Sequence, residues 1–214
     1  MIDPSDGYLN ALMATQQRPG AEAELKAMRQ GLAPDAFRVL GKAVYWLKNQ
    51  SQLGLVSLLD AGCASAYYHE VIEFYTPGWV EYTGIDFNTE AIHMAKALYP
   101  DRPLFVANIM QMGFVNQQFD AVLSAATINH IKKWRLALAE LTQVCRHWLI
   151  LHRLPVHEEE TMVSTAEAYG ETVWDIVFNS QELAFTLAKK GFSRIWLEEW
   201  GGLTTQVWER QSRP

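Results

Sequence analysis

The chain has 214 residues, of which 49% are apolar and 20% are charged, and its formal net charge is −6. This balance is ordinary for a single globular domain with an α/β core. Basic residues are no denser than pairs such as Lys132-Lys133, which excludes a surface built for a phosphate backbone, and we expect no nucleic-acid partner.

The cysteine content and the first residues predict the compartment. Cys63 and Cys145 lie in apolar runs and are too few for a disulfide framework. Residues 1–7 lack the basic and apolar regions of a signal peptide, and no apolar run approaches the length of a membrane span. We therefore expect a cytoplasmic protein with no membrane partner.

Residues 1–52 are predicted to form a helical extension or lid. Strong helix formers fill 21–29, and breaks are expected at Arg18-Pro19-Gly20 and at Leu32-Ala33-Pro34. From residue 53 the pattern changes to short apolar runs that alternate with amphipathic stretches. This alternation predicts a parallel sheet covered by helices, in a second unit that spans 53–214.

Five apolar runs in the second unit have the length of buried strands. They are residues 56–60, 80–86, 103–107, 119–124 and 148–152. Asn88 and Thr89 can cap a helix after the second run. Trp134, Leu138 and Leu141 share one face of another helix, which is expected to cover the sheet.

The last third of the chain predicts a helix followed by a hairpin. Residues 179–182 read Asn-Ser-Gln-Glu, a possible capping box, and Gly191 supplies the stop of the helix that it opens. Two strand-like runs, 192–200 and 203–208, flank Gly201-Gly202, a pair that permits positive φ in a tight turn. An antiparallel hairpin at this point differs from a purely parallel dinucleotide-binding sheet.

The segment 58–66 indicates a ligand site. An apolar strand runs into small residues after Asp60, and a helix is expected from about Tyr67. Ligands of open α/β sheets bind beyond the carboxyl ends of the strands, where small residues let them approach the backbone. Asp86 ends the next strand, 24 positions after Gly62, where a carboxylate can accept hydrogen bonds from ribose hydroxyls. Together these features predict a nucleotide-like ligand.

The order of these segments resembles the class I S-adenosylmethionine-dependent methyltransferases over about residues 53–208. Segment 59–66 is similar to the first motif of that family and 83–88 to the second, while 108–120 and 124–131 have the spacing of later motifs. The resemblance implies a Rossmann-like, seven-stranded, mostly parallel sheet with helices on both faces and the C-terminal antiparallel hairpin. It implies S-adenosylmethionine as the cofactor and S-adenosylhomocysteine as the product.

The resemblance also implies the cofactor-binding residues. Asp86 would hold the ribose and Phe87 would pack on adenine, whereas Asn108 stands where an aspartate usually meets the adenine amino group. The expected set is Asp60, Gly62, Ala64, Asp86, Phe87, Asn108, Ile109 and Ser124. Ala64 and Ala66 replace glycines of the first motif, and an alanine is expected there only if its φ is negative.

The reaction needs in-line positioning of a nucleophile and a route for its proton. His130 and His152 follow or end the fourth and fifth strands, and an imidazole can take a proton near neutrality, so both are candidate bases or orienting groups. An equal alternative is that each histidine only bonds a neighbouring loop. Asn129 is a further candidate on the substrate side.

Other parts of the chain are candidates for substrate contacts. Arg153 could bind a substrate carboxylate, but pairing with one of the glutamates at 158–160 is favoured. Residues 156–178 lie where this family often builds a substrate cover, and Tyr45 and Trp46 could close the other side. No metal is expected, because the chain has no His, Asp and Glu pattern selective for one.

The sequence therefore predicts S-adenosylmethionine-dependent methyl transfer to a small-molecule acceptor. One alternative is a non-catalytic protein on the same fold that binds an adenosyl compound or another nucleotide. A less favoured alternative is an NAD-dependent oxidoreductase, because the loop lacks two of the fingerprint glycines and the C-terminal hairpin does not suit that fold.

Overall fold

The computed structural model describes residues 11–168 and 171–211. The α-helices of this part are α1 (Ala11–Arg29), α2 (Asp35–Gln50), α3 (Tyr68–Tyr75), α4 (Thr89–Leu98), α5 (Trp134–Val144) and α6 (Ser180–Lys189). The strands are β1 (Val56–Ala61), β2 (Val80–Asp86), β3 (Leu104–Val106), β4 (Phe119–Ala125), β5 (Cys145–Leu154), β6 (Val156–His157), β7 (Met162–Ala168), β8 (Glu171–Asn179), β9 (Phe192–Trp200) and β10 (Leu203–Arg210). Each helix of the described ranges is too short or too polar to cross a lipid bilayer.

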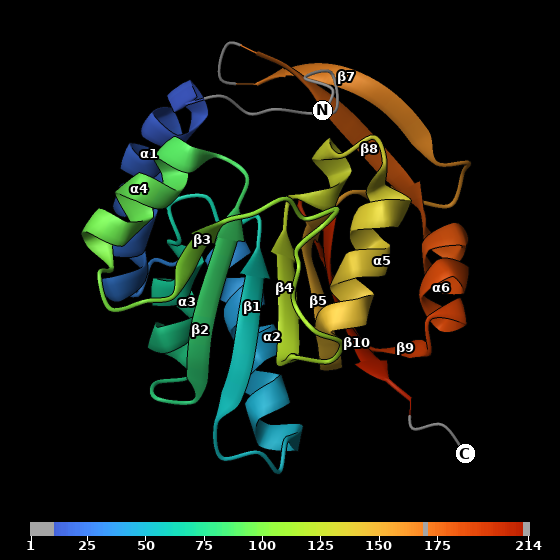
Figure 1. The fold of residues 1–214 in the computed structure, drawn as a ribbon, viewed down its shortest axis with the longest axis horizontal. Coiled ribbons are helices and arrows are strands. Elements are labelled where there is room, and N and C mark those ends of the chain that lie inside the picture. The colour runs from blue at the N-terminus through green and yellow to red at the C-terminus, as the bar shows by residue number, and fades with distance from the viewer. Residues whose placement is uncertain (1–10, 169–170, 212–214) are drawn as a thin grey trace.

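Seven strands form the central sheet, in the order β3-β2-β1-β4-β5-β10-β9 (Figure 1). The first five strands of this order pair in parallel, and β10 pairs antiparallel with both β5 and β9. Gly201 and Gly202 both have positive φ in the turn between β9 and β10. The predicted fold, a seven-stranded mostly parallel sheet finished by an antiparallel hairpin, is confirmed.

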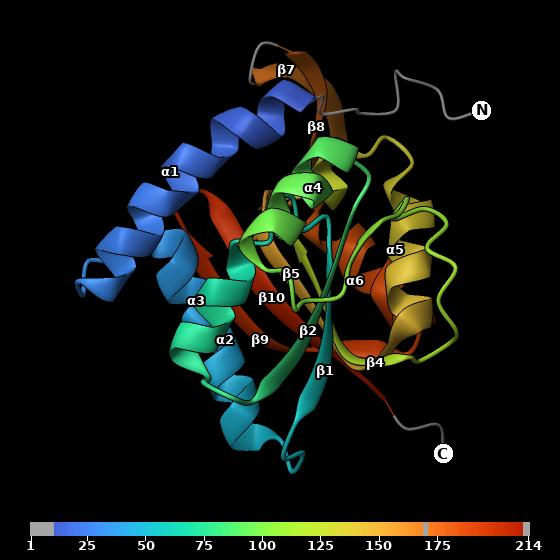
Figure 2. The ribbon, with the colours of Figure 1, turned by 60° about the vertical axis from the view of Figure 1, so that its left-hand side comes forward.

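The sheet lies between two helical layers, each with its own apolar core. Figure 2 shows α1, α2 and α3 on one face and α5 and α6 on the other. One core joins the first group to β1 and β2, with Leu40, Val71 and Tyr82 among its buried side chains. The other core lies under α5 and α6, and it contains Trp134 and Leu141, as the periodicity of that segment predicts.

Local signals in the sequence set several of the helix ends. The side-chain oxygen of Asn88 accepts a hydrogen bond from Ala91 N and so caps α4. Asn179 caps α6 in the same way, by accepting from Glu182 N. The expected break at residues 32–34 is also present, because α1 ends at Arg29 and α2 begins at Asp35.

The expected break at Arg18-Pro19-Gly20 is wrong, because α1 continues through Pro19. A proline inside a helix removes one backbone hydrogen bond, so other contacts must hold the helix together. Arg18, which is 8% exposed, pairs with Glu22 one turn later at 2.9 Å and donates to the Tyr99 hydroxyl at 3.1 Å. These tertiary contacts offset the break that the local sequence favours.

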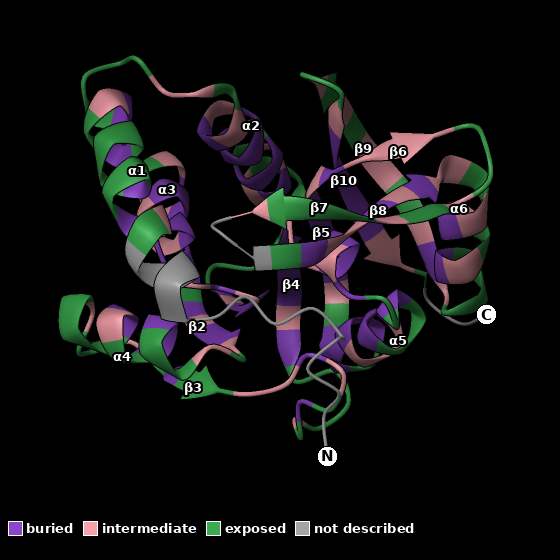
Figure 3. Cartoon of the chain, turned by 90° about the horizontal axis from the view of Figure 1, so that it is seen from above, coloured by how far each residue is buried: buried purple, intermediate pink, exposed green. Residues whose placement is uncertain are grey.

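A second sheet, in the order β6-β8-β7, lies across the carboxyl end of the central strands (Figure 1). Strand β8 is anchored in the core, since Ile176 and Phe178 are fully buried. Strand β7 is mostly exposed, as the view from above in Figure 3 shows. Within 156–178, β7 and β8 are therefore an antiparallel pair with a buried inner strand, above the edge at which the cofactor loop is expected.

Candidate functional site

Strand β1 ends at Ala61 and leads directly into a turn that only glycine fits. Gly62 has φ of +88°, and its amide and that of Cys63 both donate to Ile85 O, at 2.8 and 2.9 Å. A Cβ atom on Gly62 would lie 2.3 Å from Thr127 Oγ1. The need for glycine here therefore comes from the β4–α5 connection packed against the loop as well as from backbone conformation.

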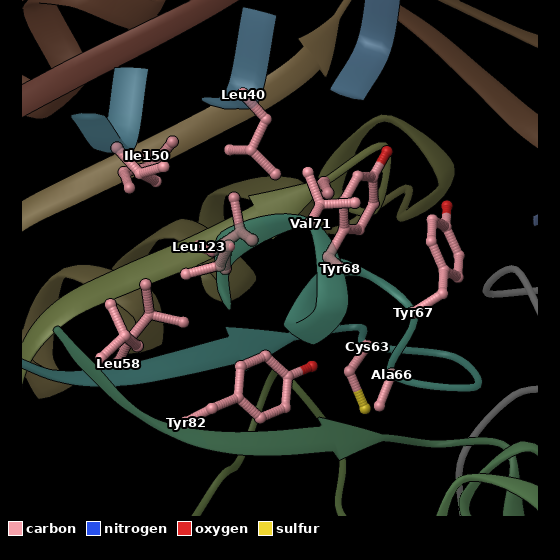
Figure 4. Close-up of a cluster of buried hydrophobic side chains, with 14 of the residues drawn as sticks. Leu40, Leu58, Cys63, Ala66, Tyr67, Tyr68, Val71, Tyr82, Leu123 and Ile150 are labelled. Atoms are coloured by element: carbon pink, nitrogen blue, oxygen red, sulfur yellow. The ribbon is translucent and has the colours of Figure 1, made fainter. Parts of the chain in front are cut away.

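Both alanines of the loop have positive φ, +48° at Ala64 and +58° at Ala66. This corrects the expectation that φ is negative at these positions. The main chain keeps a left-handed path even though each Cβ makes that path costly, by roughly 1–2 kcal/mol per residue. The Ala66 methyl is buried beside Cys63 (Figure 4), while Ala64 is partly exposed. The loop is thus strained at both alanines, and of the two only Ala64 is open to a ligand.

Replacing Ala64 with glycine is expected to tighten cofactor binding by roughly twofold to tenfold. The change relieves backbone strain and removes a methyl group from the exposed side of the loop. Calorimetry with S-adenosylhomocysteine would measure the effect. Ala66→Gly is the matched control, because it relieves similar strain at a buried position and should leave affinity nearly unchanged. Equal affinities of Ala64→Gly and the wild type would mean that the Ala64 methyl does not limit binding.

Asp86 ends β2 and holds the same loop in place. Its Oδ2 accepts from Ala64 N and its Oδ1 from Asn88 N, both at 2.8 Å. Burial raises the pKa of Asp86, and the backbone donors at Asn88, Ala64 and Phe87 oppose that rise. Each carboxylate oxygen still has a lone pair for a ribose hydroxyl. The side chain can therefore bind a ribose while it fixes the strained Ala64.

Asp60 lies beneath the loop and is completely buried. Its Oδ2 accepts from the Tyr82 hydroxyl at 2.7 Å, and its Oδ1 has no hydrogen-bond partner in the described chain. Burial raises the pKa of Asp60 to about 7. The Tyr82 hydrogen bond opposes this rise, and the charge of Asp86 adds a smaller increase. Tyr82 was not predicted as part of the site. The β1–β2 register pairs Tyr82 with Leu58, which lies two residues before Asp60 and on the same face of the sheet as Asp60.

The expected adenine-binding residues follow β2 and β3. Phe87 is 41% exposed and lies directly after Asp86. Asn108 Oδ1 accepts from Met110 N at 2.9 Å, which fixes the turn but leaves the oxygen a second lone pair. Ile109 is buried. The Asn108 side chain therefore can still contact adenine, although its Oδ1 already accepts a hydrogen bond from Met110 N.

Buried polar atoms without a partner collect at the carboxyl end of the sheet. Nine such side-chain atoms occur in the described chain, and six of them belong to residues at or just after the ends of β1, β4 and β5. These six residues are Asp60, Ser65, Tyr68, Ser124, Asn129 and His152. Because buried polar groups normally have partners, this cluster is the part of the described chain in which a polar ligand would satisfy the most unpartnered atoms. Ser65 was not predicted, since a serine among small residues carries no distinctive signal.

His130 is held between a strand and a loop. Its Nδ1 lies 2.7 Å from Trp174 O in β8, and its Nε2 lies 3.2 Å from Asn129 Nδ2. A carbonyl only accepts, so Nδ1 carries the proton and Nε2 accepts from Asn129 Nδ2. His130 thus connects the end of β4 to β8, and its Nε2 could receive a proton only in place of the Asn129 hydrogen bond.

His152 is correctly placed at the edge of the sheet but is not a base for neutral pH. It is 1% exposed, its Nδ1 lies 2.8 Å from Thr205 Oγ1, and its ring stacks on Trp200 with centroids 5.8 Å apart. Burial, with the nearby charge of Arg153, lowers the pKa of His152 to about 3. The imidazole is therefore neutral at physiological pH, which corrects the expectation that it accepts a proton there.

Tyr45 and Trp46 lie away from the site, contrary to expectation. Helix α3 begins at the cofactor edge and ends at Tyr75, whose ring packs against Gly41 of α2. Tyr45 and Trp46 follow one turn further toward the end of α2 that precedes β1. They therefore flank the opposite end of the sheet, with Tyr45 56% exposed and Trp46 packed on the core.

The favoured pairing of Arg153 with a glutamate at 158–160 is also wrong. Within residues 11–168 and 171–211 no carboxylate lies within 4 Å of its guanidinium. Arg153 is half-buried and has φ of +56°. Strand β5 thus ends in a strained residue that carries a positive charge without an ion pair.

Comparison with known proteins agrees with this geometry. Residues 59–148 match a family described as "Methyltransferase domain". The fold is similar to an amino pentose methyltransferase from Micromonospora echinaspora solved with S-adenosylmethionine (TM-score 0.62, 16% identity, 87% of this chain and 96% of that one). It is also similar to a magnesium protoporphyrin IX methyltransferase from Synechocystis solved with the same cofactor (TM-score 0.60, 13%, 95% and 99%). No curated protein matches the sequence.

A further similar structure is 1,6-didemethyltoxoflavin-N1-methyltransferase from Burkholderia thailandensis (TM-score 0.61, 13% identity, 94% of this chain and 88% of that one), solved with its substrate and S-adenosylhomocysteine. The family match covers residues 59–148, less than half of the chain, and the solved structures show that the fold around that match is similar to the fold of methyltransferases.

Proposed function

We propose that the protein transfers the methyl group of S-adenosylmethionine to a small-molecule acceptor. The observation that carries this proposal is the cluster of six buried polar residues without partners at the carboxyl end of the sheet. Two of the similar proteins, from Burkholderia thailandensis and Micromonospora echinaspora, are described as methyltransferases of a toxoflavin precursor and an amino pentose. Small acceptors are thus compatible with this arrangement of strands.

The proposed cofactor site extends along the edge from β2 to β4. Asp86 accepts hydrogen bonds from the ribose hydroxyls, Phe87 covers one face of adenine, and Asn108 and Ile109 meet its polar edge. The loop at Gly62 and Ala64 offers backbone close to the methionine part, and Ser124 lies beside it. When bound, the cofactor supplies a sulfonium methyl group that is already activated for transfer.

On the acceptor side, the residues of the chain position groups and receive a proton. His130 presents Nε2 as the acceptor for a proton, while its Nδ1–H bond to Trp174 O fixes the ring. Asn129 orients the acceptor through its buried Oδ1, which lacks a partner among the described residues. We propose 53–214 as the catalytic unit, with 156–178 as a cover that excludes water and 1–52 as an extension beside it.

Binding and transfer can be tested separately. Calorimetry should show that S-adenosylhomocysteine binds the wild type, and absence of binding at millimolar concentration would refute the proposal. The protein, S-adenosylmethionine labelled in its methyl group and a small-molecule extract should give label in the low-molecular-weight fraction. Label found only in protein or nucleic acid would contradict a small acceptor.

A further inference from the structure

Arg153 lies just beyond the point where β5 and β4 separate. Ala125 pairs with His152, and Ala126 N donates to His152 O at 2.8 Å, so the next residue, Arg153, stands at the edge of the site. Both Ala126 and Arg153 have positive φ, +50° and +56°. A bulky residue rarely takes this conformation, and the surrounding structure holds it there. The strained backbone fixes the direction of the arginine side chain.

The surroundings of Arg153 are polar but carry little opposing charge. Burial acts to lower the pKa of Arg153, and Tyr68, Tyr67 and the more distant Glu24 outweigh it. Its charge in turn disfavours a proton on His152. Burying a cation without a carboxylate at contact distance is unfavourable. A bound anion would offset the unfavourable free energy of keeping the Arg153 charge partly buried.

Tyr67 and Tyr68 pack against each other beside Arg153. Their ring centroids lie 4.4 Å apart, both side chains are buried, and Figure 4 shows their hydroxyls on the same side of the drawn cluster. The Tyr68 hydroxyl interacts with the Arg153 guanidinium and the Tyr67 hydroxyl, and no closer hydrogen-bond partner is present in the described part of the chain. His152 Nε2, on a ring 5.4 Å from that of Tyr68, is buried without a partner there. These polar atoms therefore lie beside a cation that has no carboxylate partner among the described residues.

We propose that Arg153, with Tyr67 and Tyr68, forms a carboxylate-binding subsite for the methyl acceptor, so the acceptor is a small organic carboxylate. This inference rests on the proposed function. The planar guanidinium matches a carboxylate with two parallel hydrogen bonds, and a tyrosine hydroxyl can donate a third. One cation balances a monoanion, whereas a phosphate dianion would need a second basic group.

We assign the subsite to the methyl acceptor because Arg153 lies at a distance from the cofactor loop that follows β1. Arg153 is the second-last residue of β5, which is two strands from β1 in the order β1-β4-β5. At about 4.8 Å per strand, its backbone is roughly 10 Å from the end of β1, where the cofactor loop begins. It is also joined within a few residues to β6, which pairs with β8 of the cover.

The test uses the full chain saturated with S-adenosylhomocysteine. Calorimetry compares phenylacetate with phenylacetamide, a probe of the same shape without the charge. The wild type should bind the carboxylate about tenfold more tightly or better, and Arg153→Gln should remove this preference while it changes S-adenosylhomocysteine affinity by less than about twofold. Arg146→Gln is the matched control, since Arg146 pairs with Asp120 at the other end of β4.

Each other outcome has a definite meaning. Equal binding of the two probes by the wild type would overturn the subsite. Loss of S-adenosylhomocysteine affinity in Arg153→Gln would also overturn it, because Arg153 would then serve the cofactor. If Arg153→Gln does not fold, Tyr68→Phe should weaken phenylacetate alone. Failure of the wild type to bind S-adenosylhomocysteine would instead refute the proposed function.

Discussion

Asp86→Ala is expected to weaken cofactor binding by roughly 1–3 kcal/mol, or about one to two orders of magnitude in the dissociation constant. Two effects combine, because the ribose loses a charged acceptor and the Ala64 amide loses the partner that holds the strained loop. Asp86→Asn keeps the volume and one accepting oxygen, so its loss should be smaller. Calorimetry with S-adenosylhomocysteine measures all three proteins.

Asp120→Asn is the matched control for this result. Asp120 is also a partly buried aspartate in the central sheet, but it lies at the start of β4, where it accepts from Ser57 and pairs with Arg146. Its replacement should leave cofactor affinity within about twofold while lowering stability. Unchanged affinity in Asp86→Ala would remove Asp86 from the site.

Asp60→Asn is expected to make the cofactor-free protein more stable at pH 8, by up to about 4 kcal/mol. The pKa of Asp60 is about 7 in the folded protein and 3.8 in its ordinary state. Between these values the folded chain binds more protons than the unfolded chain. Stability therefore falls as pH rises through this window, and the loss is complete above pH 7. An asparagine carries no charge and can still accept from Tyr82.

Urea unfolding at pH 5 and pH 8 checks this expectation. The stability difference between Asp60→Asn and the wild type should be smaller at pH 5 than at pH 8. Asp120→Asn should cost the same stability at both pH values, because Ser57 and Arg146 lower the pKa of Asp120 against the effect of burial, and Asp120 is then ionised in the folded and the unfolded chain throughout this range. Parallel pH curves for the wild type and Asp60→Asn would contradict a buried, proton-binding Asp60.

Prediction from the sequence succeeded where neighbouring residues decide the structure. The caps at Asn88 and Asn179 and the turn at Gly201-Gly202 involve groups within a few residues of one another. Pro19 shows the limit of such signals. Its local preference breaks a helix, but Arg18 contacts Tyr99, 81 positions away, and the helix continues.

The candidate site divides in the same way. Gly62 and Asp86 could be predicted because a fixed spacing places the ends of adjacent parallel strands together. The positive φ of Ala64 could not, since alanine ordinarily avoids that conformation and only the Asp86 and Ile85 contacts impose it. The prediction of Tyr45 as a site residue was wrong, because the packing of α2 against α3 decides which end of the sheet Tyr45 lies near.

The sequence by itself determined the strands of the central sheet, the turn after β1 and the acid at the end of β2, because spacing and hydrophobic pattern act along the chain. It did not predict the second sheet of β6, β7 and β8. The tertiary structure alone decided the electrostatic state of the site. Burial keeps His152 neutral and raises the pKa of Asp60. Among the described residues, packing also leaves Arg153 without an ion pair to the glutamates that follow it. Desolvation and ion pairing depend on distances between segments, which no local pattern of residues specifies.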